Sequence, residues 1–338
     1  MHDKSLLFSL AFAICVGLPA YGQTIEDTHK ALSNGNFSVA IAGFQTLADQ
    51  GNSDAQCLLA LMYAQGQGTK KDPEKAAFWF LKAAESGNSK GQLMAGFNFL
   101  HGTGVVPDEN RARYWYQKAA SQGEVAAQYD LAVMLSKGEG GPVDDVMAFG
   151  WFQKAAEQGD INAQDKLGEI YSIGLGVDKD VGQAAIWYRK AAEQGFSDAQ
   201  FHLGTSYKDG RGVLKDEAQA AKWFHLAAEQ GHARAQFNLG TIYFKGQGVP
   251  KSEEKGVQLF QSAAERGLTD AQIILGTLYV KGQGVTKDYQ QAYFWLLLAS
   301  ADSNKIATGI REVVEKYLTD SQKNKAQDDV KNWKPKTT

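Results

Sequence analysis

The chain has 338 residues, a formal net charge of −3 and a calculated isoelectric point near 6.1. That balance excludes the strongly basic character typical of nucleic-acid-binding proteins, so we expect no nucleic-acid partner. Hydrophobic residues make up 43% and charged residues 22%, with both charge signs interspersed, which excludes a long disordered block.

The N-terminus has the features of a secretory signal peptide. Lys4 precedes an apolar run over residues 6–18, and the small residues Ala20 and Gly22 fit a cleavage site after Gly22. The run is short for a membrane span, although an uncleaved anchor is the alternative interpretation. We therefore predict a signal peptide over 1–22 and a periplasmic or secreted protein, with no stable membrane insertion after cleavage.

Cysteine usage is compatible with export without disulfides. Removal of residues 1–22 also removes Cys15, and Cys57 is then the one remaining cysteine, which leaves no pair for an internal disulfide. Cys57 is either a small buried hydrophobe or a reactive thiol, and we favour the first interpretation.

The next segment, 23–52, predicts a degenerate helical hairpin that caps the structure. Apolar residues recur within 25–50 at spacings that suit the buried faces of two helices. These residues are Ala31, Phe37, Ala40, Phe44 and Leu47.

Residues 53–302 consist of seven copies of one pattern at a constant interval of 36 residues. Each copy contains a glutamine, followed ten and twelve residues later by two glycines. The glutamines are Gln56, Gln92, Gln128, Gln164, Gln200, Gln236 and Gln272. A period of this size is typical of stacked supersecondary units in a solenoid.

The copy that begins at Asp198 predicts an antiparallel pair of helices. Ala199, Leu203 and Tyr207 form one apolar stripe, and Gly210 and Gly212 end that helix. Asp216 is a suitable N-cap for a second helix, whose apolar face carries Ala220, Trp223, Ala227 and Ala228. A glycine inside the first helix, Gly204 here, predicts that the helices cross closely.

The pattern ends near residue 303. Residues 303–333 predict C-terminal capping helices, one over 304–319 and a second that ends at Trp333, and 334–338 predict a frayed tail. The whole chain is therefore expected to be an all-α solenoid of 36-residue helix-turn-helix repeats.

The repeat consensus closely resembles the Sel-1-like repeat family, which is related to tetratricopeptide repeats. The residues that carry the resemblance are Ala-Gln-x-x-Leu-Gly-x-x-Tyr-x-x-Gly-x-Gly-Val-x-x-Asp, then Ala-x-x-Trp and Lys-Ala-Ala-x-x-Gly. The resemblance implies a right-handed α/α superhelix and an adaptor role in assembling complexes. Some exported members bind or weakly hydrolyse β-lactams, but those are cysteine-rich, so that activity is not carried over to this chain.

No motif predicts catalysis, a metal or a cofactor. The Gly-x-Gly loops follow helices rather than strands and lack the Gly-Lys-Ser/Thr of a phosphate-binding loop. Ser252 and Lys255 match Ser-x-x-Lys, yet Ser252 stands where other repeats have an N-cap aspartate. His202, His225 and His232 lack the spacing of a zinc site. We therefore predict no enzyme, no catalytic residue and no cofactor.

The concave face of such a solenoid is the expected site for a protein or peptide partner in the cell envelope. Positions just outside the core stripe of each first helix would line it, with Asp165 and Glu169 meeting a basic residue. The alternative is that the apolar members pack against neighbouring helices. The predicted lining residues are Leu61, Leu93, Phe97, Tyr129, Val133, Asp165, Glu169, Phe201, Thr205, Phe237, Thr241, Phe244, Ile273 and Thr277.

Two other functions stay open at this point. Aromatic groove residues also suit a peptidoglycan or carbohydrate ligand, and a weak β-lactam-binding or hydrolysing enzyme is the less favoured alternative. We expect a monomer.

Overall fold

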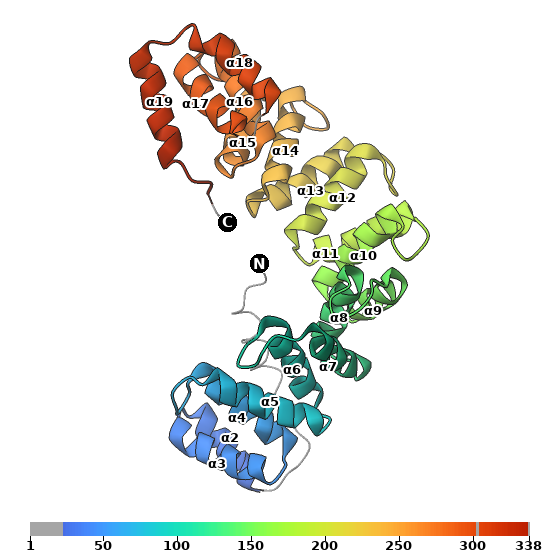
Figure 1. Ribbon diagram of the computed structural model, residues 1–338. Coiled ribbons are helices and arrows are strands. Elements are labelled where there is room, and N and C mark those ends of the chain that lie inside the picture. Colours follow the sequence, from blue (N-terminus) through green and yellow to red (C-terminus); the bar gives the residue numbers. More distant parts are fainter. Residues whose placement is uncertain (1–22, 302–303, 337–338) are drawn as a thin grey trace. The chain divides into compact units, whose positions relative to one another are not determined.

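The computed structural model describes residues 23–301 and 304–336, so the predicted signal peptide lies outside the described residues. The described residues form 18 helices and contain no strand (Figure 1). None of these helices is long and apolar enough to cross a membrane. In chain order they are α2 (Gln23–Ser33), α3 (Phe37–Asp49), α4 (Ser53–Gln65), α5 (Pro73–Glu85), α6 (Ser89–His101), α7 (Glu109–Ser121), α8 (Val125–Lys137), α9 (Asp145–Glu157), α10 (Ile161–Ile173), α11 (Val181–Glu193), α12 (Ser197–Asp209), α13 (Glu217–Glu229), α14 (Ala233–Lys245), α15 (Glu253–Glu265), α16 (Thr269–Lys281), α17 (Tyr289–Ser300), α18 (Lys305–Glu315) and α19 (Asp320–Asn332).

Successive helices pack as pairs, which confirms the predicted all-α repeat solenoid. The first helix and the second helix of a repeat contact each other, as α4 does with α5, α12 with α13 and α16 with α17. Within a unit, the second helix also contacts the first helix of the next repeat, as α5 does with α6 and α13 with α14. Apolar side chains are buried between successive helix pairs, so the chain has no single closed core.

The pair α12–α13 shows how the repeated residues build this core. Leu203 and Phe224 are completely buried, and Gly204 lies against the Phe224 ring. A Cβ atom at Gly204 would lie 2.8 Å from that ring, so the glycine allows the close helix crossing that the sequence predicts. The turn also follows the prediction. Gly210 ends α12 in the left-handed conformation, and the Asp216 side chain accepts the N–H groups of Ala218 and Gln219.

The most buried aromatic position of the second helix is not the tryptophan. Trp223 keeps 7% of its surface exposed, and Trp79, Trp115 and Trp151 are half-buried. The aromatic residue that follows the tryptophan is also in the core, so the buried stripe of the second helix is one residue wider than the sequence predicts. These buried aromatic residues are Phe80, Tyr116, Phe152, Tyr188 and Phe224.

A chain of buried glutamine amides links each repeat to the one before it. The Gln200 Nε2 donates to the Ala192 carbonyl at 3.2 Å, and its Oε1 accepts from the Gln230 Nε2 at 2.8 Å. Gln92 and Gln128 make the same two kinds of bond, with Gln122 and Gln158 as the donors to Oε1. The repeated glutamine is thus a structural residue, because it satisfies a buried carbonyl between helices.

Gln56 makes the first of these two hydrogen bonds, from its Nε2 to the Ala48 carbonyl, but not the second. Its Oε1 is buried without a hydrogen-bond partner, because Ser86 stands where Gln122 donates to Gln92 and is too short to reach. We expect Ser86→Gln to raise the free energy of unfolding by about 1 kcal/mol in a urea titration, since it supplies the missing donor. Ser86→Ala is the control, and equal stability of the two variants would contradict this account.

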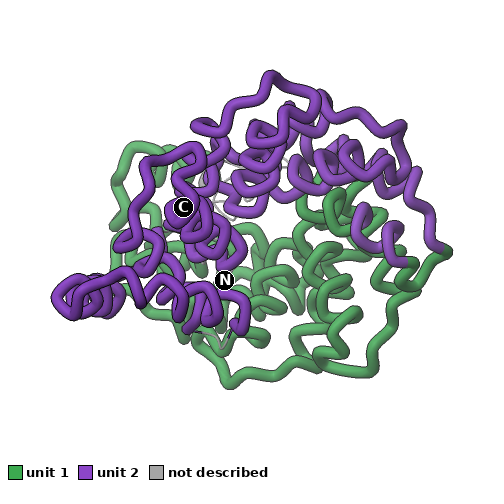
Figure 2. The backbone as a smooth tube through the Cα atoms, turned by 90° about the horizontal axis from the view of Figure 1, so that it is seen from above, with its two compact units in different colours: residues 1–166, 174–178 green, residues 167–173, 179–338 purple. Residues whose placement is uncertain are grey.

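The helices group into two compact units (Figure 2). Unit 1 contains Met1–Lys166 and Gly174–Asp178, and unit 2 contains Leu167–Ile173 and Lys179–Thr338. The division falls within α10, which is itself one unbroken helix.

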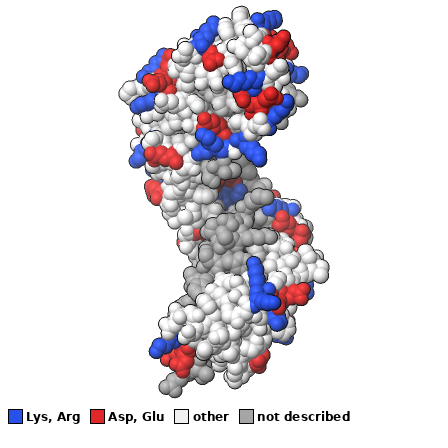
Figure 3. Space-filling view, turned by 90° about the vertical axis from the view of Figure 1, so that its left-hand side faces the viewer, with Lys and Arg blue, Asp and Glu red and all other residues white. Residues whose placement is uncertain are grey.

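Both charge signs are interspersed on the face shown in Figure 3. Several ion pairs join residues that are close in the sequence: Lys75 lies 3.7 Å from Asp72, and Lys251 lies 2.7 Å from Glu253. This surface has the mixed character that the composition predicts.

The C-terminal segment differs from the frayed tail that the sequence predicts. The Lys336 backbone N–H donates to the Glu265 carbonyl at 2.9 Å, and its Nζ lies 2.6 Å from the Glu265 carboxylate. The chain beyond α19 therefore folds back onto the end of α15.

Candidate functional site

Unit 2 contains a pocket of about 610 Å³ between α10, α11 and α12, and we call it the unit 2 pocket. It is lined by side chains of all three helices and of the two loops that follow the first helices. The lining residues are Ser172, Ile173, Lys179, Val181, Ala184, Tyr188, Phe201, His202, Thr205, Ser206 and Arg211.

The wall formed by α12 is held in place by local hydrogen bonds. The Thr205 hydroxyl donates to the Phe201 carbonyl at 2.9 Å, and the Ser206 hydroxyl donates to the His202 carbonyl at 3.0 Å. Phe201 and His202 lie one turn earlier on the same helix and present an aromatic ring and an imidazole. The α12 wall of the pocket therefore combines two hydroxyl groups with the Phe201 ring and the His202 imidazole.

Phe201 is fixed from the other side by His232. The two rings stack at 4.7 Å with an interplanar angle of 20°. His232 caps α14, because its Nδ1 accepts the Ala235 N–H at 3.1 Å, and its Nε2 lies 3.3 Å from the Asp198 carboxylate. That hydrogen bond from His232 lowers the pKa of Asp198 below its usual value. His232 is therefore a structural residue.

Two cations lie at the loop end of the pocket. Lys179 and Arg211 occupy the loops after α10 and α12, and the Arg211 guanidinium lies 3.6 Å from the Asp209 carboxylate. The Arg211 side chain is 70% exposed, so this pair is weak and its partner can be exchanged for a ligand carboxylate.

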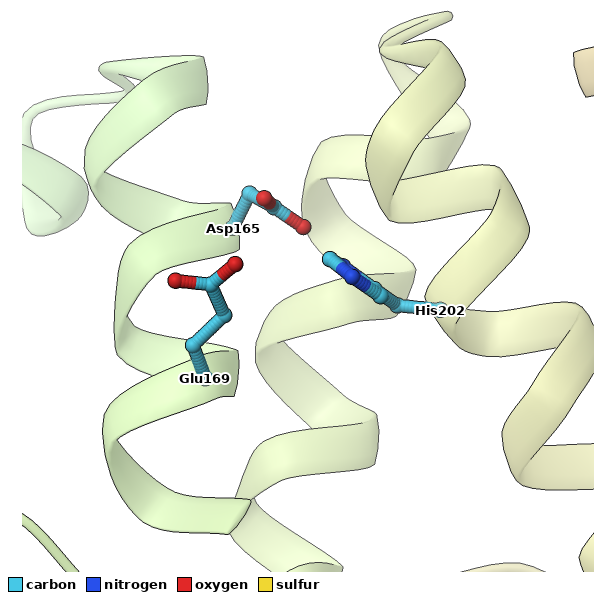
Figure 4. A group of neighbouring side chains, drawn as sticks. All are labelled: Asp165, Glu169 and His202. Atoms are coloured by element: carbon cyan, nitrogen blue, oxygen red, sulfur yellow. The ribbon is translucent and has the colours of Figure 1, made fainter. Parts of the chain in front are cut away.

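Asp165, Glu169 and His202 come together from α10 and α12 (Figure 4). Each offers one ligand atom, and these atoms all lie within 4.8 Å of one another. Asp165 is buried, whereas Glu169 and His202 are half-buried. The two carboxylates belong to the groove that the sequence predicts, and His202 adds a nitrogen donor that also lines the unit 2 pocket.

His202, His225 and His232 do not form one cluster, and each makes different contacts. His225 pairs with Glu229 on the exposed face of α13 at 3.3 Å, and His232 caps α14. Among the described residues, the potential metal ligands that meet are His202 and two carboxylates.

The other predicted groove residues do not form one continuous lining. Leu61, Leu93 and Phe97 are buried, with 2%, 4% and 3% of their surfaces exposed, so they pack in the core rather than present a surface. Tyr129 and Val133 are half-buried, and the Tyr129 ring packs 5.6 Å from Phe152 on the second helix.

The later predicted residues are half-buried and also contact the core. Phe237 and Phe244 pack against Phe260, at 5.5 and 6.1 Å between ring centroids. Ile273 packs against the core around α17, and the Thr241 and Thr277 hydroxyls donate to carbonyls one turn earlier. Of the predicted set, Phe201 and Thr205 line the unit 2 pocket.

Sequence reasoning missed the pocket residues that come from loops and from the second helix. Lys179, Arg211 and Tyr188 lie outside the first helices to which the groove was assigned. A signal for Arg211 is present, because the following two repeats have glutamine there, at Gln247 and Gln283. Ser252 was assigned correctly as an N-cap, since its hydroxyl accepts the Lys255 N–H.

Comparisons with known proteins support one family. The Sel1 repeat model matches seven times, at residues 53–88, 89–124, 125–160, 161–196, 197–232, 233–268 and 269–304. A solved structure of a Sel1 repeat protein from Oxalobacter formigenes is 33% identical, covers 92% of this chain and 86% of that chain, and has a TM-score of 0.68.

Two further solved structures are similar. A protective antigen present in uropathogenic Escherichia coli strains, with an SLR fold, is 28% identical over 98% of this chain and 91% of its own, with a TM-score of 0.46. Helicobacter pylori cysteine rich protein B is 30% identical over 38% of this chain and 92% of its own, with a TM-score of 0.32. A search of curated proteins found no match.

Proposed function

The chain belongs to the Sel1 repeat family, and from that premise we propose that it is a non-catalytic, exported scaffold that binds a segment of a protein partner in the unit 2 pocket. Sel1 repeat proteins in general mediate protein–protein interactions, and helical repeats present extended surfaces suited to this. The expected location of the partner is the cell envelope, which follows from the signal-peptide prediction.

The observation that supports the pocket as the binding site is that its residues vary between repeats that share one fold. Where the repeat of α12 has His202, the next two repeats have Asn238 and Ile274, and Arg211 is replaced by glutamine in both. The helix pair therefore does not require these side chains, unlike the glutamines, glycines and buried aromatic residues. Side chains that the fold does not require are available for binding.

The pocket suits a segment that combines an apolar side chain with charged ones. Tyr188 and Phe201 offer aromatic contacts, and the Lys179 and Arg211 cations suit a carboxylate. Asp165 and Glu169, on the adjacent face of α10, suit a basic residue of the same segment. The pocket volume of about 610 Å³ accommodates a few side chains rather than a folded domain.

The test compares one substitution inside the pocket with the same substitution at an equivalent position outside it. We expect Thr205→Lys to reduce capture of the partner from an envelope extract by at least about tenfold, because the lysine fills the pocket. Thr277→Lys is the matched control, since both hydroxyls donate to a carbonyl one turn earlier. Quantitative mass spectrometry of the captured proteins, with thermal melts as a folding check, gives the readout. Equal capture of the partner by the two variants would contradict binding in the unit 2 pocket.

A further inference from the structure

We propose that Asp165, Glu169 and His202 bind a Zn²⁺ ion. The two carboxylates and the imidazole offer one ligand atom each, and these atoms lie within 4.8 Å of one another. In a tetrahedral zinc site with bonds of about 2.1 Å, ligand atoms are about 3.4 Å apart, so small side-chain rotations would bring the three donors to an ion. The zinc site follows from the donor geometry and does not require a bound partner, but a bound ion would take the place of the basic residue proposed above for Asp165 and Glu169.

Two helices bring the donors together. Asp165 and Glu169 are four residues apart on α10, which places them on the same face of that helix one turn apart. His202 lies on α12 and extends toward them (Figure 4). Donors on helices are held more rigidly than donors on loops, which favours a defined coordination geometry.

All three donors are exceptions to the repeat. The position of Asp165 holds Cys57, Leu93, Tyr129, Phe201, Phe237 and Ile273 in the other repeats, and the position of Glu169 holds Leu61, Phe97, Val133, Thr205, Thr241 and Thr277. The position of His202 holds Leu58, Met94, Asp130, Lys166, Asn238 and Ile274. Three potential metal ligands thus replace mostly apolar or neutral residues at the place where they meet.

The donor types favour a transition metal over Ca²⁺ or Mg²⁺. An imidazole nitrogen with carboxylates suits Zn²⁺, whereas Ca²⁺ and Mg²⁺ prefer ligand sets made of oxygen alone. Asp165 is only 7% exposed and Glu169 is half-buried, and a divalent cation would offset the repulsion between the two neighbouring carboxylates.

Three protein ligands leave a coordination position open in a zinc site. His202 also lines the unit 2 pocket, so that position lies beside the cavity and takes a water molecule or a donor atom from a bound segment. The metal would then add a directional contact at the His202 side of the pocket, in addition to the two cations at its loop end.

The experiment measures Zn²⁺ binding to the tag-free protein by isothermal titration calorimetry with zinc chloride. We expect one saturable site per chain, and at least about a tenfold loss of affinity in Glu169→Gln and in His202→Asn. Asparagine already occurs at the equivalent Asn238, so this replacement suits the repeat. His225→Asn is the matched control, because His225 contacts one carboxylate only, and its affinity should equal that of the wild type.

A second readout identifies the ligand directly. Zinc should shift the imidazole resonances of His202 in nitrogen-15 NMR and leave those of His225 in place. Zinc binding that is absent, or that is unchanged in both Glu169→Gln and His202→Asn, would overturn the proposal. Equal affinity for Mg²⁺ or Ca²⁺ would overturn the assignment to zinc.

Discussion

Gly212→Ala is expected to lower the free energy of unfolding by about 3 kcal/mol or more, the largest effect that we predict for a single methyl group. Gly212 has a φ of +71°, and a Cβ atom there would overlap the carbonyl group of Val181 at the start of α11. The substitution therefore combines backbone strain with a clash against a backbone that is fixed by its own helix. Chemical denaturation of the purified protein measures the loss.

Gly195→Ala separates the two causes. Gly195 has a φ of +92°, but nothing lies within 4 Å of a Cβ added there. Its cost should be limited to the backbone term, about 1 kcal/mol. If Gly212→Ala cost no more than Gly195→Ala, close packing between repeats would not explain the second glycine of the loop.

The same contact recurs along the chain, which explains the second glycine. A Cβ at Gly104 would meet the Pro73 carbonyl, and one at Gly140 would meet the Glu109 carbonyl. The first glycine ends the first helix, whereas the second lets the loop touch the second helix of the preceding repeat. The distance between successive repeats therefore requires glycine at this second loop position, because any larger residue would place its Cβ against the neighbouring backbone.

Asp130→Asn should stabilise the protein at pH 8 by about 2 kcal/mol and have little effect at pH 4. Burial raises the pKa of Asp130 to about 7, while a hydrogen bond from the Tyr116 hydroxyl opposes this rise and repulsion from Asp160 adds to it. A pKa shift from 3.8 to about 7 corresponds to a destabilisation of about 4 kcal/mol. Because Asp130 is half-buried and solvent screens its charge, we expect a destabilisation of about 2 kcal/mol.

The sign of this effect follows from proton binding. Between pH 4 and pH 7 the folded protein keeps a proton on Asp130 that the unfolded chain has released, so stability from this group falls as the pH rises. Asparagine removes the titration and still accepts the Tyr116 hydroxyl. Urea titrations at pH 4, 6 and 8 measure both proteins, and parallel pH profiles would contradict the assignment.

Much of the fold could be predicted because every repeat has the same local signals. Gly210 as a C-cap, Asp216 as an N-cap and Gly204 at the helix crossing follow from residue type and spacing, and the structure confirms each. Trp223 is buried as predicted, but the sequence did not identify the more deeply buried Phe224 beside it. The two positions are adjacent on the helix, and the packing of the neighbouring helices determines which side chain is buried more deeply.

The site was less predictable, because it depends on which side chains meet across three helices and two loops. Asp165 and Glu169 could be identified as exceptions within one helix. The proximity of His202, and the contribution of Lys179 and Arg211 to one cavity, depend on the distance between consecutive repeats. Leu61 and Phe97 were assigned to a surface by alignment with the repeat, but burial is set by neighbours that the alignment does not contain.

Site-specific photo-cross-linking in the cell envelope tests most directly whether a partner occupies the unit 2 pocket. A photoreactive amino acid in place of Thr205 should give one cross-linked product with a protein partner, and the same amino acid in place of Thr277 should give none. A product from position 277 alone, or identical products from both positions, would contradict binding in the unit 2 pocket.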